Sequence, residues 1–390
     1  MIKKIISLFI ITAYIIPYAY AETATEISGE YSIAGTHLDK NDINYQYFEH
    51  ELNLQAVISI EGTTLTTKAG IIDETWGDEN NTGNADMELD RCWLTHVFPT
   101  GFKLEVGKMP GKQWGTMLGN GHDEAGYYRV KGTRVTGNTE LIGYLQKNVE
   151  KGETAPLTKD SERDDADEAS VGVIHKIGKI SLMPKLTYTN DSSVDDSGTP
   201  AQTDKGEDGT QTFEAVFAVT GDVGSVLFET EMIYTDVSSD YPLEAEYALF
   251  TAWVDAKIDF NSVITGLSLA YGTEDDGIGL GSFGEDFSPM IIMDNDDGAI
   301  SDLGAMFFAR LYAEAEPLEG LRTGCAFAYG KYEKEAYAAV SDKTGLFEIN
   351  ITGDYAVTKS LKYSAGVAYA DVDAHRDAII QVEHELVFSF

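Results

Sequence analysis

The sequence predicts an all-β protein: a transmembrane, antiparallel, up-and-down β-barrel of about 18 strands, with 16 as the alternative. Three observations carry this prediction. Apolar and polar residues alternate in segments of roughly ten residues. Short and long connections alternate between these segments, and the final segment, 377–390, ends on an aromatic residue.

Segment 377–390 shows the alternation plainly. Its even positions from Ile380 onward are apolar or aromatic apart from His384, and its odd positions are mostly polar. An edge strand of a soluble sandwich is the alternative, but an exposed Phe-x-Phe end invites pairing with other chains. In a barrel the last strand meets the first, so no backbone group stays unpaired in hydrocarbon. His384 is a polar group on the lipid-facing side, and we expect it to mark a subunit contact.

The first 21 residues have the pattern of a secretory signal peptide. Lys3 and Lys4 precede an apolar run over 5–16, and Ala19-Tyr20-Ala21 forms an A-x-A cleavage pattern. We therefore expect residues 1–21 to be removed and residues 22–390 to form one barrel. No later window approaches the length of a transmembrane helix, which leaves the periplasm, the outer membrane or secretion.

Taken in order, the first three predicted strands span about 26–36, 51–60 and 64–72. A polar loop begins at Asp73. The next hairpin, 89–108, is the clearest, because Phe102, Leu104 and Val106 alternate with polar residues after a tight turn. Short turns are expected at 61–62, 99–101, 136–138, 178, 221–224, 261–262, 317–320 and 358–360. Short turns on one side and long loops on the other are typical of outer-membrane barrels, in which the short turns are periplasmic.

Aromatic residues recur at a fixed spacing along these strands. A tyrosine lies eight residues after the first outward apolar position in five pairs: Ile180 and Tyr188, Val226 and Tyr234, Val263 and Tyr271, Leu321 and Tyr329, Leu361 and Tyr369. This spacing spans roughly 26 Å of strand, close to the height of an apolar membrane band. An opposite girdle is expected from Phe98, Phe102, Phe260, Phe388 and Phe390.

The formal net charge is −37, which repels nucleic acid and attracts cations. The two cysteines, Cys92 and Cys325, fall in outward apolar rows, and we expect them to be unpaired. Acidic loops follow Asp160, Asn190 and Met293, and the last has the composition but not the register of an EF-hand. We expect no cofactor, and at most loosely bound Ca²⁺ or Mg²⁺ that bridges these loops to lipopolysaccharide phosphates.

The signal sequence, the hairpin GFKLEVGK (101–108) and the terminal LVFSF (386–390) resemble those of Gram-negative outer-membrane porins. The resemblance implies a water-filled channel and a homotrimer in contact with outer-membrane lipid and lipopolysaccharide. It also implies that the barrel-assembly machinery recognises the last strand. In porins the third external loop commonly folds into the lumen and faces basic residues on the wall.

That loop corresponds here to 110–126, which lacks the Pro-Glu-Phe-Gly-Gly signature of general porins. The alternation of apolar and polar residues predicts inward side chains for Lys103, Glu105, Arg129 and Lys131 on the strands that flank this loop. It places Arg134 at the periplasmic rim. The candidate constriction residues are Lys103, Glu105, Lys112, Trp114, Asp123, Glu124, Arg129 and Lys131.

No catalytic constellation or nucleotide-binding motif is found, so we expect a protein that is not an enzyme. The function expected is passive diffusion of small hydrophilic solutes and ions with a preference for cations, although basic wall residues could reverse it locally. The alternatives are a substrate-specific channel for a sugar, an amino acid or an anion, and a structural or adhesive barrel.

Overall fold

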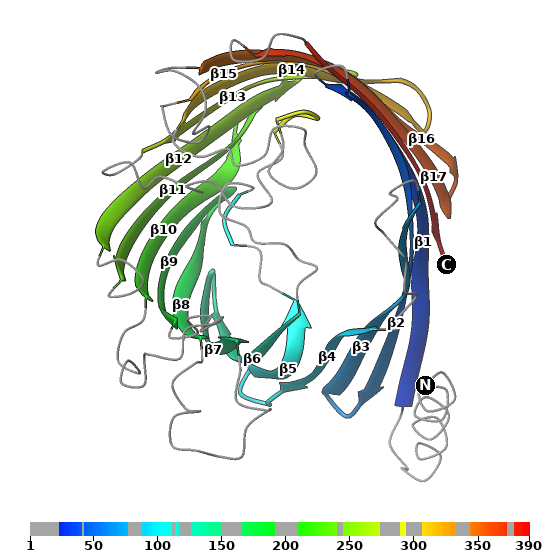
Figure 1. Ribbon diagram of the computed structural model, residues 1–390. Coiled ribbons are helices and arrows are strands. Elements are labelled where there is room, and N and C mark those ends of the chain that lie inside the picture. The colour runs from blue at the N-terminus through cyan, green and yellow to red at the C-terminus, as the bar shows by residue number, and fades with distance from the viewer. Residues whose placement is uncertain are drawn as a thin grey trace, which may run out of the picture.

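The computed structural model describes residues 23–40, 43–76, 88–110, 114–116, 126–149, 166–191, 210–239, 245–273, 289–293, 306–332, 344–372 and 378–390. These residues form one closed antiparallel sheet of 18 strands, which confirms the predicted fold and strand number (Figure 1). None of the described residues belongs to a helix long and apolar enough to cross a membrane. The expected signal peptide lies outside the described residues.

Each strand pairs with its neighbours in sequence, so the topology is up-and-down. The strands are β1 (Thr23–Lys40), β2 (Ile43–Ile60), β3 (Thr63–Trp76), β4 (Glu88–Val97), β5 (Phe102–Pro110), β6 (Gly126–Thr136), β7 (Thr139–Val149), β8 (Ala166–Ile177), β9 (Ile180–Asp191), β10 (Thr210–Val223), β11 (Val226–Ser239), β12 (Ala245–Asp259), β13 (Val263–Gly272), β14 (Met306–Leu318), β15 (Leu321–Tyr332), β16 (Thr344–Thr358), β17 (Leu361–Val372) and β18 (Ile379–Ser389).

The ring closes where β18 pairs with β1, as the alternation of the last segment predicts. The pairing runs from Glu30 opposite Ser389 to Asp39 opposite Ile380. Just beyond it, Gly29 and Phe390 exchange two backbone hydrogen bonds of 2.9 and 3.0 Å. Closure therefore extends to the last residue, so the end of β18 is not an open sheet edge, which hydrocarbon would not tolerate.

Short turns occur at each of the predicted places and lie at one end of the barrel. Two show why these residues are required: Gly137 has a φ of 58° and Asn261 a φ of 70°, a region that most side chains avoid. The strand ends at the other end of the barrel were predicted less accurately. β3 continues to Trp76, into the stretch expected to be loop, because pairing with β2 resumes after a register shift at Leu52/Asn53 and extends to Phe48. β1 and β2 are also longer than expected.

The outer face of the sheet is apolar, as predicted. The tyrosines of the five spaced pairs are all exposed, and so are Phe98, Phe260, Phe388 and Phe390 near the short turns; Phe102 is half-buried. Cys92 and Cys325 are free, as expected, and His384 is on the outer face. A closed barrel with an apolar outer band and polar groups inside is suited to a membrane.

Candidate pore and its two inward segments

The predicted wall residues of β5 and β6 face the lumen. Glu105 is buried, and its Oε2 lies 3.1 Å from Lys103 Nζ and 3.0 Å from Lys131 Nζ. All three side chains alternate with the outward Val106 and Val130. One carboxylate thus offsets two ammonium groups, and this wall presents only a small net positive charge. Arg134, expected at the rim, is exposed beside the turn that joins β6 and β7.

Arg129 on β6 is buried and anchors the base of the loop that follows β5. Its Nε donates to Gln146 Oε1 at 2.7 Å, and its Nη1 donates to the carbonyl of Pro110 at 3.4 Å. The guanidinium carbon lies 4.1 Å from the centre of the Tyr144 ring, a cation–π distance. Because these contacts surround the guanidinium, Arg129 is enclosed within the wall.

Residues 114–116 lie inside the barrel and pack against the wall formed by β8, β9 and β11. Trp114 is buried, and its Nε1 donates to the carbonyl of Met183 on β9 at 3.0 Å. Its ring covers Gly172 on β8, where an added Cβ would lie 2.4 Å from a ring carbon. Glu231 Oε2 on β11 accepts hydrogen bonds from the backbone N–H and the hydroxyl of Thr116, each at 2.6 Å. This segment, named inward segment A, therefore folds into the lumen.

The other candidates in this loop, Lys112, Asp123 and Glu124, lie outside the described residues. For Lys103, Glu105, Arg129, Lys131 and Trp114, the structure gives positions on the lumen side, whereas a role in constriction remains a prediction.

A second inward segment, 289–293, was missed by the sequence analysis, which assigned Met293 to an acidic external loop. All five residues of this inward segment B are buried. Glu348 on β16 accepts from the backbone N–H groups of Ile291 and Ile292 through Oε1, both at 3.0 Å, and from that of Met293 through Oε2 at 2.9 Å. The signal available in the sequence was the short apolar run PMIIM within an otherwise polar connection.

Similar contacts are found at inward segment B and around inward segment A, where Pro110 at the end of β5 takes the place of Pro289. At the start of inward segment B, Arg310 on β14 donates from Nη1 to the carbonyl of Pro289 at 2.6 Å, as Arg129 does to Pro110. Arg310 also stacks on Tyr312, with 4.6 Å between the guanidinium carbon and the ring centre. A wall arginine thus binds a proline carbonyl, and a wall glutamate binds backbone N–H groups nearby. Buried charges that are hydrogen-bonded in this way hold irregular backbone inside a barrel.

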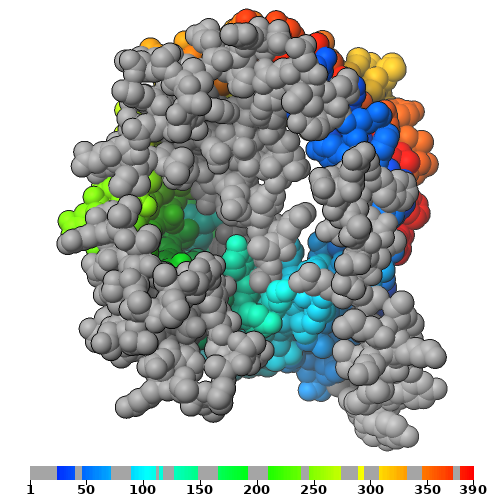
Figure 2. Space-filling view, viewed as in Figure 1, coloured from blue at the N-terminus to red at the C-terminus, as the bar shows by residue number. Residues whose placement is uncertain are grey.

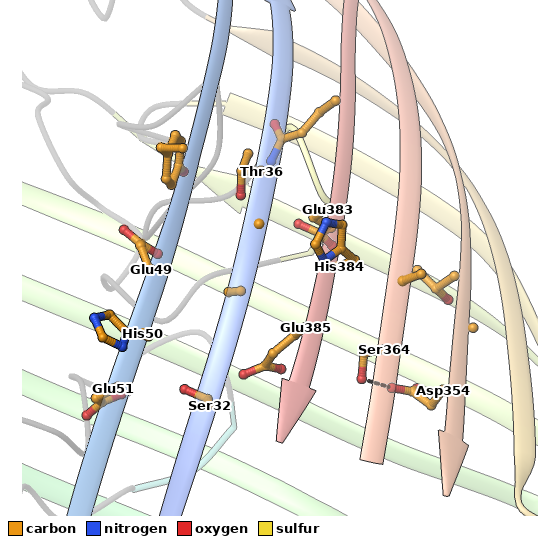
Figure 3. Close-up of a pocket in the computed structure, with 17 residues that line it drawn as sticks. Ser32, Thr36, Glu49, His50, Glu51, Asp354, Ser364, Glu383, His384 and Glu385 are labelled. Atoms are coloured by element: carbon orange, nitrogen blue, oxygen red, sulfur yellow. Dashed lines mark hydrogen bonds between the residues drawn. The ribbon is translucent and has the colours of Figure 1, made fainter. Parts of the chain in front are cut away.

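A different part of the wall, formed by β16, β17, β18, β1 and β2, is acidic. It lines a cavity of about 830 Å³, whose carboxylates are Glu49, Glu51, Asp354, Glu383 and Glu385. Figure 3 shows these side chains spread over the neighbouring strands. Among the described residues that line this cavity there is no lysine or arginine. We call this surface the acidic wall.

The structure also bears on metal binding. Among the described residues, no three or more His, Cys, Asp or Glu side chains are grouped so that they could hold a metal ion. Most of the acidic external loops lie outside the described residues, so loose binding of Ca²⁺ or Mg²⁺ there stays a prediction.

No protein-family model and no curated protein sequence matches the chain. Among solved structures, the chain is similar to OccK2 (OpdF) of Pseudomonas aeruginosa, with 10% identity, a TM-score of 0.64, and coverage of 94% of this chain and 97% of that one. OccK2 is also known in complex with glucuronate. OccAB3 of Acinetobacter baumannii gives 11% identity, a TM-score of 0.61 and coverage of 94% and 100%. The outer membrane protein opdK of Pseudomonas aeruginosa gives 11%, 0.62, 94% and 98%. These likenesses show that the chain has the fold of outer-membrane porin barrels.

Proposed function

We propose that the protein is a passive channel of the bacterial outer membrane for small hydrophilic solutes, with a preference for cations. The observation that carries the proposal is the combination of a closed barrel, an apolar outer face and a charged lumen narrowed by two inward segments. Figure 2, viewed along the same direction as Figure 1, shows the ring hollowed near its centre. A lumen that is narrowed but not filled by ordered segments is the arrangement expected of a diffusion channel.

The distribution of charge supports the preference for cations. The buried Arg129 donates to the carbonyl of Pro110 at the end of β5, and the half-buried Arg310 donates to that of Pro289 in inward segment B; Lys103 and Lys131 share Glu105. The acidic wall, in contrast, presents five carboxylates to a cavity whose described lining residues include His50 and His384 but no lysine or arginine. Charged groups that line a pore set the local concentration of ions of opposite sign.

A substrate-specific channel is the second candidate. The observation that favours it is that two inward segments, rather than one, are fixed by buried hydrogen bonds, which gives a pore of defined shape. Similarity to OccK2, solved with glucuronate, is compatible with this candidate, but the acidic wall favours a cationic solute over a carboxylate. The homotrimer and the contact with lipopolysaccharide remain proposals from the resemblance to porins. The contact of His384 with another subunit remains a proposal from its polar side chain on the outer face.

Conductance of the purified chain in a planar bilayer tests the function. We expect discrete openings in KCl, and in a KCl gradient a reversal potential of the sign that cation flow produces. A clear anion preference would contradict the proposed selectivity. Silence of a folded barrel would instead favour a structural or adhesive role.

A further inference from the structure

We propose that the acidic wall is a binding site for organic solutes with two or more ammonium groups, such as short diamines and linear polyamines. The proposal rests on the channel function above and names a substrate class for it. The site is built from both ends of the chain, since β1 and β2 supply one half and β16, β17 and β18 the other (Figure 3).

The register of these strands places three carboxylates in one row around the wall. Glu49 pairs with Ala34, which pairs with Glu385; Glu385 pairs with Ser364, which pairs with Asp354. The acids therefore occupy every second strand, about 10 Å apart, with a small residue between each two. That spacing leaves open wall between the carboxylates where the carbon chain of a solute can lie.

Two further carboxylates flank this row along the strands. Glu51 follows Glu49 by two residues on β2, and Glu383 precedes Glu385 by two residues on β18, which separates each pair by about 7 Å. A single Ca²⁺ needs oxygen atoms about 2.4 Å away on several sides, so this spread does not form a metal site, in agreement with the geometry of the described residues. Separated positive charges on a flexible chain fit it better.

A second, independent feature points to a ligand with N–H donors. Gln381 on β18 lines the same cavity and is 3% exposed, yet its Oε1 has no hydrogen-bond partner. A buried carbonyl oxygen without a donor is unfavourable, and most such groups in proteins are satisfied. An ammonium group beside Gln381 would supply the missing donor.

The acidic wall also lies beside inward segment B. At Gly366 on β17, an added Cβ would lie 2.8 Å from both Glu383 Oε1 and Ile291 Cδ1, so these two atoms approach the same point. A solute that passes inward segment B on this side therefore meets Glu383. Lys362, whose Nζ lies 2.9 Å from Asp354 Oδ1, offsets part of the negative charge at the edge of the wall. Five carboxylates line the cavity and no lysine or arginine does among the described residues, so the lining attracts cations.

Block of the potassium current by spermidine tests the site in single channels of the full chain. We expect spermidine to block at lower concentration than ethylammonium, which has one ammonium group. The double variant Glu383→Gln, Glu385→Gln should raise the half-blocking spermidine concentration about tenfold, which corresponds to about 1.4 kcal/mol. Gln381→Met, which removes the buried acceptor, should raise it as well.

Glu214→Gln is the matched control, because Glu214 is a lumen-side carboxylate on β10, ion-paired with Lys185 at 3.1 Å and away from the acidic wall. The half-blocking spermidine concentration of this control variant should match that of the unmodified chain. Equal block of the double variant and the unmodified chain would overturn the site, as would equal block by spermidine and ethylammonium in the unmodified chain. This last comparison needs no variant to fold. Absence of any potassium current would contradict the channel function itself, a result distinct from current without block.

Discussion

Glu231 holds Thr116, although 115 positions separate them in the chain: one carboxylate oxygen accepts both the backbone N–H and the hydroxyl, each at 2.6 Å. Both residues are buried, with Glu231 at 0% and Thr116 at 3% exposure. Because Glu231 belongs to the rigid wall and Thr116 to a connection, this contact fixes inward segment A within the lumen.

The first prediction tests whether inward segment A is held by the hydrogen-bond acceptor of Glu231 or by its negative charge. Glu231→Ala removes both hydrogen bonds, each worth about 1.5 kcal/mol or more when the acceptor is charged, so inward segment A should loosen and single-channel conductance should rise. Glu231→Gln keeps an acceptor oxygen and should stay near the original conductance. Glu214→Gln controls for loss of a lumen-side carboxylate. Unchanged conductance in Glu231→Ala would mean that inward segment A does not limit the pore.

The second prediction concerns Gly115, between the two anchored residues of inward segment A. Its φ is 84°, and an added Cβ would lie 2.5 Å from Glu231 Oε1. Gly115→Ala should therefore cost about 1–2 kcal/mol in backbone strain alone and displace the segment, raising conductance as Glu231→Ala does. In the Glu231→Ala background the clash is gone, so the added effect of Gly115→Ala should shrink. Equal effects in both backgrounds would show that the two residues are not coupled.

The third prediction concerns inward segment B. Glu348→Ala removes the acceptor of three buried backbone N–H groups. We expect the single-channel conductance to rise and the free energy of unfolding to fall by about 3 kcal/mol. Combined with Glu231→Ala, the two changes in stability should add, because the two glutamates hold different segments. Circular dichroism during heating measures the stability. Strong non-additivity would reveal contact between the two inward segments.

The fourth prediction concerns the seam. Deletion of Phe390 removes both backbone hydrogen bonds to Gly29, and Gly29→Ala places a Cβ 2.6 Å from Phe390 Cζ. Both changes should lower the yield of folded barrel, measured as the fraction that migrates as the compact species in unheated gels. Phe98→Ala removes an aromatic of the same girdle away from the seam and should fold normally. Normal yield after deletion of Phe390 would contradict a role of the last residue in closure.

The sequence by itself determined the barrel, the places of the short turns and the side of the wall that each residue faces. It could do so because strand alternation and turn chemistry are local, as residues 101–108 and Asn261 illustrate. The same alternation placed Glu105 and Lys131 inside and Cys325 outside.

Only the tertiary structure decided which chain segments fold into the lumen and which charged side chains lie close together there. Inward segment B was missed because its anchor, Glu348, lies 55 to 57 positions away and looks in sequence like any polar residue of a strand. The acidic wall joins Glu49 to Glu385 only once β1 and β18 pair in one register. Glu231 likewise shows its role only when Thr116 reaches it. Contacts between distant residues depend on closure of the ring and on the path of each connection, which no local pattern encodes.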